Sequence, residues 1–501
     1  MCLRSAGLRP EHITGGPILT STLWLCLHLA LPLARADADD VVRLLRAERV
    51  AEALDEARAS VTRDEADVES HELLIDILMN LGMGWDAQEA YRVRVQARPD
   101  DPMAWYLFGR AAVTAKEATE AYTRAVELDP KLGRAWMGLA SVDRALGQAE
   151  RAKTRYEKAL ALDPTLSEAW AGLGALHIAA GRHDLAVQVC ERAIAAIPSD
   201  PEAYLAIASL RPERALDVLQ QGAKASPEEP RVWEALAAEQ IKAGQLKDAE
   251  RALETALRLN PASSQAAFDL AVVHEIQAGH LDVAGQAALA RARLLGRDSP
   301  IAARVELDAL VERYPACHLV FLARGHTRSE QGDLTGAETD LRRAIALAPN
   351  SPDVQGALGM LLLSQGQARE GMVLLDSAHA QRPHDASLGV AAGMAHVAVE
   401  GPKAGLQVLA TVSAMHPTDA RPVMAMVSVL TQQGNAEGAF QVLANAIARF
   451  ADPSLLLAYA AAAKDIGKDA EALAALDRLY RMTGEERYAR MADALRAELR
   501  R

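Results

Sequence analysis

Apolar residues recur along this chain in pairs of short stripes at helical spacing, and residues 133–166 show the pattern well. Three apolar residues are spaced to lie on one face of a first helix and three on one face of a second, because residues three and four apart share a face. They are Trp136, Leu139 and Ala140, then Ala152, Tyr156 and Ala159. Gly147 stands between the stripes and Asp163-Pro164 follows them. A turn and a helix stop are expected there, so the pattern predicts a helical hairpin.

The hairpin pattern repeats with a period of 34 residues. Prolines mark this interval at Pro130, Pro164 and Pro198, at Pro227 and Pro261, and at Pro315, Pro349, Pro383 and Pro417. Glycines follow a similar interval at Gly147 and Gly181, then at Gly332, Gly366, Gly401, Gly434 and Gly467. A fixed period of this length indicates stacked supersecondary units rather than separate globular domains. Only 4% of the residues are aromatic, which also favours closely packed helices.

The residues at matching offsets resemble the tetratricopeptide repeat, whose pattern is Trp, Leu, Gly, Tyr, Ala, Phe, Ala and Pro. One unit has Trp170, Leu173, Gly174, His177, Ala186, Cys190, Ala193 and Pro198, and another has Trp233, Leu236, Ala237, Gln240, Ala249, Leu253, Ala256 and Pro261. Units begin near 68, 102, 133, 167, 201, 230, 264, 318, 352, 386, 420 and 453, after a degenerate unit. The resemblance implies an all-α fold, a right-handed superhelical solenoid of antiparallel helix pairs.

Several units depart from the pattern. The unit at 102–132 lacks three residues at its turn, and the unit at 201–229 lacks about five. Gln355 and Gly389 replace the first aromatic residue of their units, which predicts looser packing toward the C-terminus. The last segment, 487–501, is predicted to be a capping helix with an apolar stripe of Tyr488, Met491, Leu495 and Leu499, because the end of a repeat array needs a polar outer face.

One interruption divides the predicted array. Between Arg291 and Pro315 the spacing stretches, and Ile301 to Tyr314 has the pattern of an extra helix after a Gly-Arg-Asp-Ser-Pro break. We therefore expect an N-terminal array at 37–299, a joint at 300–317 and a C-terminal array at 318–486. Local disorder at the interruption is the alternative interpretation.

Residues 1–36 differ from the repeats. Arg4 and Arg9 precede an apolar run from Ile18 to Leu33, and Ala34-Arg35-Ala36 and an acidic stretch follow. This order is typical of a secretory signal peptide and predicts a periplasmic or secreted protein. An uncleaved membrane anchor is the alternative, although the run is shorter than the roughly 20 residues that span a bilayer.

Charge and motifs argue against several functions. The net charge of −13, with no basic run, disfavours nucleic acid as a partner. The chain has no phosphate-binding loop, no His-Glu-x-x-His pair, no Gly-x-Ser-x-Gly motif and no paired-cysteine metal signature. We therefore predict no catalytic residues, no cofactor and no metal site. Cys190 and Cys317 lie about four repeats apart, too far for a disulfide.

Three histidines and one cysteine occupy offsets that usually pack between helices. His177, His274 and His396 stand where the family has Tyr, and Cys190 stands where it has Phe. We interpret the histidines as hydrogen-bonded core residues rather than ligands, and Cys190 as a small buried hydrophobic residue rather than a reactive thiol.

The resemblance implies a groove, lined by first helices, that holds a peptide or helix of a partner protein. In the best N-terminal units the groove offsets carry Met137 and Ser141, Ala171 and Ala175, and Glu234 and Ala238, so the Lys, Asn and Arg clamp of chaperone-binding members is absent. The C-terminal offsets are more apolar, and we predict partner binding by Leu322, His326, Met360, Val390, Met394, Met424 and Leu457. Pliable methionines suit a partner helix. Packing against the adjoining first helix is the competing interpretation.

These features favour a protein-interaction scaffold or adaptor over an enzyme. The leader and the repeats together point to assembly, export or secretion at the cell envelope, with association to membrane complexes through partners. The alternative function is a regulatory sensor whose joint flexes when a partner binds.

Overall fold

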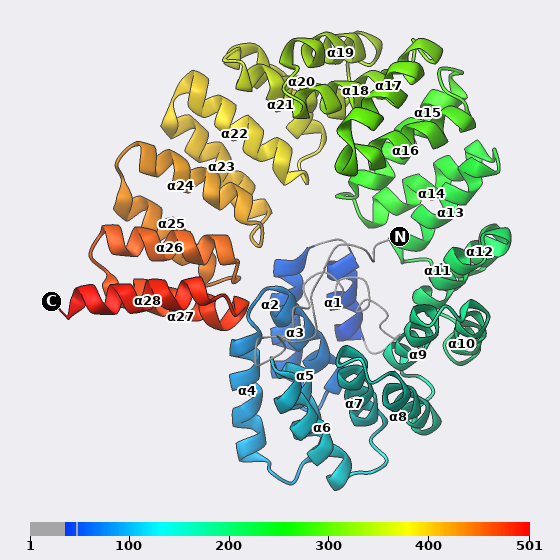
Figure 1. Ribbon diagram of the computed structural model, residues 1–501, viewed down its shortest axis with the longest axis vertical. Coiled ribbons are helices and arrows are strands. Elements are labelled where there is room, and N and C mark those ends of the chain that lie inside the picture. The colour runs from blue at the N-terminus through cyan, green and yellow to red at the C-terminus, as the bar shows by residue number, and fades with distance from the viewer. Residues whose placement is uncertain (1–35, 47–48, 501) are drawn as a thin grey trace. The chain divides into compact units, whose positions relative to one another are not determined.

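The computed structural model describes residues 36–46 and 49–500, and every regular element in them is helical (Figure 1). Contacts group these residues into two compact units. Unit 1 contains 52–198 and 443–500, with residues 36–42 of the first helix. Unit 2 contains 199–442, with residues 43–46 and 49–51. The all-α fold predicted from the sequence is confirmed.

Unit 1 consists of helical hairpins from both ends of the described chain. Its N-terminal helices are α1 (Ala36–Arg46), α2 (Val50–Arg63), α3 (Val68–Asn80), α4 (Gly84–Ala97), α5 (Pro102–Ala111), α6 (Ala115–Leu128), α7 (Gly133–Ala145), α8 (Ala149–Leu162), α9 (Ser167–Ala179) and α10 (His183–Ala196). Its C-terminal helices are α26 (Pro453–Asp465), α27 (Asp469–Thr483) and α28 (Glu486–Leu499), preceded by the end of α25 (Ala436–Ile447). Both sets follow the hairpin pattern.

Unit 2 continues the same architecture without a strand among its described residues. In chain order it begins with α11 (Pro201–Leu210), α12 (Ala215–Ala225), α13 (Pro230–Lys242), α14 (Leu246–Leu259), α15 (Ser264–Gln277), α16 (Val283–Asp298) and α17 (Pro300–Arg313). The rest are α18 (His318–Glu330), α19 (Leu334–Leu347), α20 (Pro352–Ser364), α21 (Ala368–Gln381), α22 (Ala386–Glu400), α23 (Pro402–Met415) and α24 (Ala420–Gln432). From α11 to α15 and again from α16 to α24, each helix packs against the next, as expected for a repeat solenoid.

The predicted unit starts are confirmed, because the first helix of each hairpin from α3 onward begins where the period places it. Gly147 ends one of these helices with a φ of +73°, a left-handed conformation that glycine adopts at little cost. The two short units have correspondingly short first helices, α5 and α11, of 10 residues each. A 3-10 turn at Pro212–Arg214 joins α11 to α12.

Tyrosine rings lie directly against glycines of neighbouring helices. A Cβ atom at Gly138 would lie 2.5 Å from the Tyr122 ring, and one at Gly172 would lie 2.3 Å from the Tyr156 ring. Neither contact tolerates a larger residue without movement. The glycine positions on the first helices therefore set how closely one hairpin approaches the next.

A hydrogen bond from the first helix back to the preceding proline recurs in both units. The indole Nε1–H groups of Trp105, Trp136, Trp170 and Trp233 donate to the carbonyls of Pro99, Pro130, Pro164 and Pro227 at 2.7–3.0 Å. Each bond fixes the inter-repeat turn to the helix that follows it. The tryptophan therefore orients the junction between units, a role that the spacing of apolar residues does not reveal.

Gln355 makes the same bond without an aromatic ring. Its side-chain amide donates to the Pro349 carbonyl at 2.8 Å and its oxygen accepts from Gln381 at 3.0 Å, and the side chain is buried. The expectation of looser packing at this unit is wrong, because the Gln355 amide donates to the proline carbonyl of the turn, as the tryptophan indole does in other units. Gly389 instead lies against Val412 and His379, where a Cβ would come within 3.0 Å of each.

Three helices, α15 to α17, lie between the regular hairpins on either side of the interruption. Residues Pro300–Arg313 form α17, which packs along α16 as the two helices of a hairpin do, and α16 also contacts α18. Helix α15 packs on α14, so α15, α16 and α17 form a three-helix joint between regular hairpins. The joint lies inside unit 2. The boundaries between the two compact units, at 198/199 and 442/443, therefore differ from the predicted boundary between the arrays.

Within unit 1, the hairpin of α3 and α4 meets the last hairpin, formed by α26 and α27. The amide of Ala451 donates to the carbonyl of Leu81 at 2.8 Å, and the indole of Trp85 donates to the carbonyl of Arg481 at 3.2 Å. Asp86 pairs with Arg478 at 3.1 Å. These contacts join segments more than 360 residues apart, whereas a solenoid repeat ordinarily contacts only its neighbours.

The predicted capping helix is present as α28, but only part of its apolar stripe is buried. Tyr488 and Leu495 are buried, whereas Met491 and Leu499 are 45% and 52% exposed. The predicted stripe is too wide, because the helix packs through Tyr488, Ala492 and Leu495. The predicted leader lies outside the described residues, apart from Ala36. Among the described helices, none combines the length and hydropathy needed to cross a bilayer.

The Gln355 bonds give a testable prediction. Gln355→Leu removes the donor to Pro349 and the acceptor for Gln381, so we expect the free energy of unfolding to fall by about 1 kcal/mol. Urea denaturation followed by helical circular dichroism measures this change. Gln432→Leu, at an exposed position, is the control and should change stability by less than about 0.5 kcal/mol. Equal effects of the two substitutions would contradict the role of the amide.

Candidate functional site

The three-helix joint of unit 2 contains a pocket with a volume of about 610 Å³. Helices α13, α15 and α18 contribute to its walls, together with α16 and one residue of α17. Its base is apolar and consists of the buried side chains of Ile241, Val272, Leu289 and Leu307. Because α16 and α17 stand between the first helices α15 and α18, the pocket is a direct consequence of the interrupted period.

The rim of the pocket carries charges of both signs. Asp269 and Glu330 are the acidic residues, and Lys242 and Arg293 are the basic ones. The Arg293 guanidinium lies over the Phe268 ring, 3.7 Å from its centroid. Burial raises the pKa of Asp269, although a hydrogen bond from Gln265 and the charge of Arg293 act against this shift. An apolar base with a polar rim is the usual form of a binding site in a helical protein.

His326 is the predicted site residue that the structure places in this pocket. Its ring reaches solvent, yet the pocket walls remove enough hydration to lower its pKa. The imidazole is therefore neutral near pH 7 and contributes no positive charge. Leu294, which is 67% exposed, adds an apolar side chain to the same lining.

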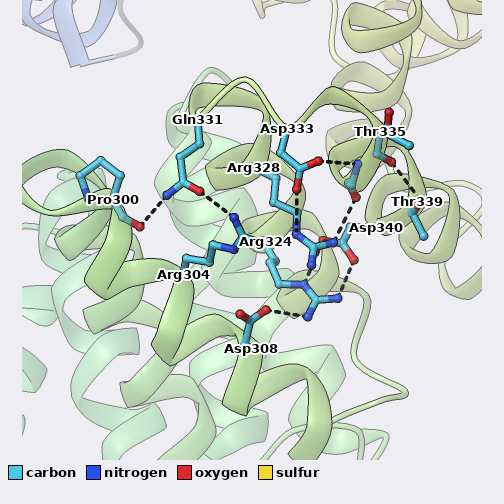
Figure 2. A network of polar contacts seen from close by, with 11 residues as sticks. Pro300, Arg304, Asp308, Arg324, Arg328, Gln331, Asp333, Thr335, Thr339 and Asp340 are labelled. Carbon is cyan, nitrogen blue, oxygen red and sulfur yellow. Dashed lines mark hydrogen bonds and ion pairs between the residues drawn. The ribbon is translucent and has the colours of Figure 1, made fainter.

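A network of ion pairs holds α18 in place beside the pocket (Figure 2). The buried carboxylate of Asp340 on α19 accepts two hydrogen bonds from Arg324, at 2.9 and 2.7 Å, and one from Arg328 at 2.9 Å. Arg324 also donates to Asp308 of α17 at 2.9 Å. Burial opposes the charge of Arg324, but these hydrogen bonds outweigh it and raise the pKa of the guanidinium. The network ties α17, α18 and α19 together.

A second link fastens the start of α17. The side-chain amide of Gln331 donates to the Pro300 carbonyl at 2.9 Å, and its oxygen accepts from Arg304 at 3.4 Å (Figure 2). Another side of α18 lines the pocket, with Ala323, His326, Thr327 and Glu330.

In unit 1, first-helix positions are occupied by ion pairs of the chain itself. Arg110 on α5 is 5% exposed at its side chain and pairs with Asp76 of α3 at 2.6 Å and with Glu168 of α9 at 2.7 Å. Arg134 of α7 pairs with Glu72 of α3. These pairs connect the first helices of successive units, α3 with α5, and of units two apart, α5 with α9 and α3 with α7. Sequence reasoning missed them, although opposite charges at equivalent offsets of neighbouring units are a signal that could have found them.

The groove residues predicted from the sequence are placed unevenly. Met360 on α20 is 40% exposed, and Val390, Met394 and Met424 are partly buried on α22 and α24. Leu322 is buried in the core beside the joint, so the structure removes it from the surface open to a partner. Leu457 belongs to unit 1 and packs on the C-terminal core.

The residues at the tyrosine and phenylalanine offsets differ in their surroundings. His396 bonds to Glu400 at 2.9 Å and Asp376 at 3.1 Å. Burial lowers the pKa of His396, but these bonds outweigh it and raise the pKa overall. His274 is 54% exposed at its side chain and pairs with Glu250 at 3.5 Å, so its interpretation as a core residue is wrong. His177 is buried, but its Nδ1 has no hydrogen-bond partner among the described residues.

Both described cysteines, Cys190 and Cys317, are buried, and no disulfide joins them. Burial, together with the negative charge of Glu275, raises the pKa of the Cys317 thiol to about 12. A thiol of this kind stays protonated and is a poor nucleophile. No group of three His, Cys, Asp or Glu side chains in the described part of the chain is placed to hold a metal ion.

Comparison with known families identifies the repeats. One family model for the tetratricopeptide repeat matches residues 143–210 and 329–393, and a second model of the same description matches residues 235–302. The match at 235–302 covers α15 and α16 of the joint and ends at the start of α17. The chain contains tetratricopeptide repeats over these residues, and such repeats are a protein-interaction scaffold. No curated protein matches the chain.

Several solved structures are similar in fold. PilW, a type IV pilus biogenesis factor, is 16% identical with a TM-score of 0.35, and the match covers 39% of this chain and 92% of that one. TTC0263, a tetratricopeptide-repeat protein of Thermus thermophilus, is 21% identical with a TM-score of 0.30, over 35% of this chain and 96% of that one. The structure of Naa15/Naa10 bound to HypK is 15% identical with a TM-score of 0.35, and the match covers 92% of this chain and 77% of that one.

The Asp340 network gives a prediction for the joint. Asp340→Ala leaves Arg324 and Arg328 partly buried without their shared carboxylate, so we expect a loss of about 3–5 kcal/mol in the free energy of unfolding. Hydrogen exchange across α17–α19 and urea denaturation measure it. Glu338→Ala, which removes a carboxylate of the same helix that pairs with Arg342 at 2.8 Å, should cost no more than about 1 kcal/mol. Similar losses for both variants would count against the network.

Proposed function

We propose that this protein is a scaffold or adaptor that binds a partner protein at the three-helix joint, in assembly, export or secretion at the cell envelope. A peptide or helix of the partner occupies the pocket and continues along the first helices toward α20 and α22. The observation that carries the proposal is the open pocket between α15 and α18, with an apolar base and a charged rim. Repeat proteins commonly use such surfaces for peptide recognition.

The surface beyond the pocket supports the same proposal. Met360 on α20 is exposed and Met394 lies at the same offset on α22, which packs beside α20. Flexible methionine side chains adapt to the apolar face of a partner helix. Unit 1 is a less suitable docking surface at α3–α9, because Arg110 and Arg134 are already paired with carboxylates of the chain.

The alternative, a sensor that flexes at the joint, has less support. Asp340, Arg324 and Asp308 connect the three helices around the joint through bonds of 2.7–2.9 Å. Bending there would separate buried charges from their partners, which is costly. A scaffold with a fixed pocket is consistent with this network.

Blocking the pocket tests the proposed function. His326→Trp places a large ring at an exposed position inside the pocket, and His384→Trp places the same ring at an exposed position outside it. The tagged full-length chain is expressed in its native cells, and its crosslinked partners are identified by mass spectrometry. We expect the partner recovered with the unmodified chain and His384→Trp to fall at least about tenfold with His326→Trp, a change of about 1.4 kcal/mol. Equal recovery, with unchanged circular dichroism, would refute docking at the pocket.

The proposed location rests on the order of charges and apolar residues in residues 1–36. We expect a chain recovered from the periplasmic or secreted fraction to begin at Asp37, since Ala34-Arg35-Ala36 has the small-x-small pattern of a cleavage site. Amino-terminal sequencing measures this directly. A chain that keeps residues 1–36 and sediments with membranes would favour an uncleaved anchor, and a chain confined to the cytoplasm would contradict export.

A further inference from the structure

Two carboxylates face the joint pocket without an ion pair. Asp269 is half-buried and accepts a hydrogen bond from Gln265 at 2.8 Å. Glu330 lies on the rim and is exposed. Within the described residues, neither carboxylate has a Lys, Arg or His nitrogen within ion-pair distance. This differs from Asp340 nearby, which is buried and pairs with two arginines.

The basic residues of the pocket already make contacts within the chain. Lys242 pairs with Glu239 on its own helix at 2.6 Å, and Arg293 stacks on Phe268. His326 is neutral near pH 7, because loss of hydration lowers its pKa. Arg293 keeps its charge and acts against the rise in the pKa of Asp269. With Lys242 paired to Glu239, two carboxylates and one guanidinium remain in the lining, so the charge left for a ligand to neutralise is negative.

We propose that the pocket binds a lysine or arginine side chain of the partner protein, with the charged group between Asp269 and Glu330 and the alkyl stem on the apolar base. This inference rests on the proposed function, because it names the chemistry of the segment that docks there. Lysine and arginine suit the pocket, since they can bury their stems along apolar surface while the charge meets a carboxylate. The buried side chains of Leu289 and Val272 supply that surface.

The cost of burying Asp269 supports a basic ligand over an acidic one. Burial raises the pKa of Asp269, which means that its surroundings do not fully stabilise the charged form. A cation from the partner replaces the hydration that the carboxylate has lost. An acidic side chain in the same place would be repelled by Asp269 and Glu330, so the pocket discriminates by sign of charge.

Peptides of defined charge test the inference on the purified full-length chain. Two fluorescein-labelled amphipathic peptides of alanine and leucine differ only in carrying lysine or glutamine on the polar face, and fluorescence anisotropy measures their dissociation constants. We expect the lysine peptide to bind about tenfold more tightly, as charge-assisted hydrogen bonds allow. The double variant Asp269→Asn/Glu330→Gln should abolish this preference.

A matched variant controls for overall charge. Glu254→Gln/Glu312→Gln removes two exposed carboxylates that lie outside the pocket lining, and it should keep the preference for lysine. If this control loses the preference as fully as the pocket variant does, the attraction is general and the inference is overturned.

The pocket-blocking variant separates the two proposals. If His326→Trp abolishes peptide binding but Asp269→Asn/Glu330→Gln keeps the lysine preference, the pocket binds segments without reading their charge. That result overturns the inference and leaves the proposed function standing. If His326→Trp leaves binding of the lysine peptide unchanged, the peptide binds elsewhere and both proposals fail.

Discussion

Each helix pair in this chain depends on its neighbours to bury its apolar side, and the distance between neighbours is set where a tyrosine ring lies on a glycine. Tyr122 covers Gly138 and Tyr156 covers Gly172 so closely that no side chain fits between them. A short isolated helix is marginal in water, so burial between hairpins supplies most of the stability. The Trp–Pro bonds, from Trp136 to Pro130 for example, then fix the orientation of each turn relative to this contact.

The joint follows from the same constraint. An array of paired helices leaves no gap, because each second helix packs on the next first helix. Where α15, α16 and α17 follow one another, α16 packs along α17 and also contacts α18. The first helices α15 and α18 are then separated, and the space between them becomes a pocket. The ion pairs of Asp340 hold the walls of this pocket.

Much of the fold could be predicted from the sequence because the period is local. The starts of the first helices, the turn at Gly147 and the extra helix at the interruption all depend on residues within one unit. The role of Gln355 could not be predicted, because replacing a tryptophan ring with an amide suggests a loss of packing. Only the structure shows that the amide donates to the Pro349 carbonyl. The contact of Leu81 with Ala451 could not be predicted either, because a repeat period describes only neighbouring units. For the site, His326 was found by its offset, whereas Asp269 and Arg293 were missed because the pocket exists only where the repeat pattern fails.

The charges of the chain separate into two kinds, and the distinction points to where a partner binds. Asp76, Glu168 and Asp340 each meet an arginine of the chain at 2.6–2.7 Å, so their charge serves to hold helices together. A carboxylate that is half-buried and unpaired costs free energy in the isolated protein. Asp269 is such a group, and it lies in a pocket that packing between regular hairpins would not create. The cost is offset when a partner supplies the missing cation, and this gives a physical reason for binding to be selective at the joint rather than along every groove position.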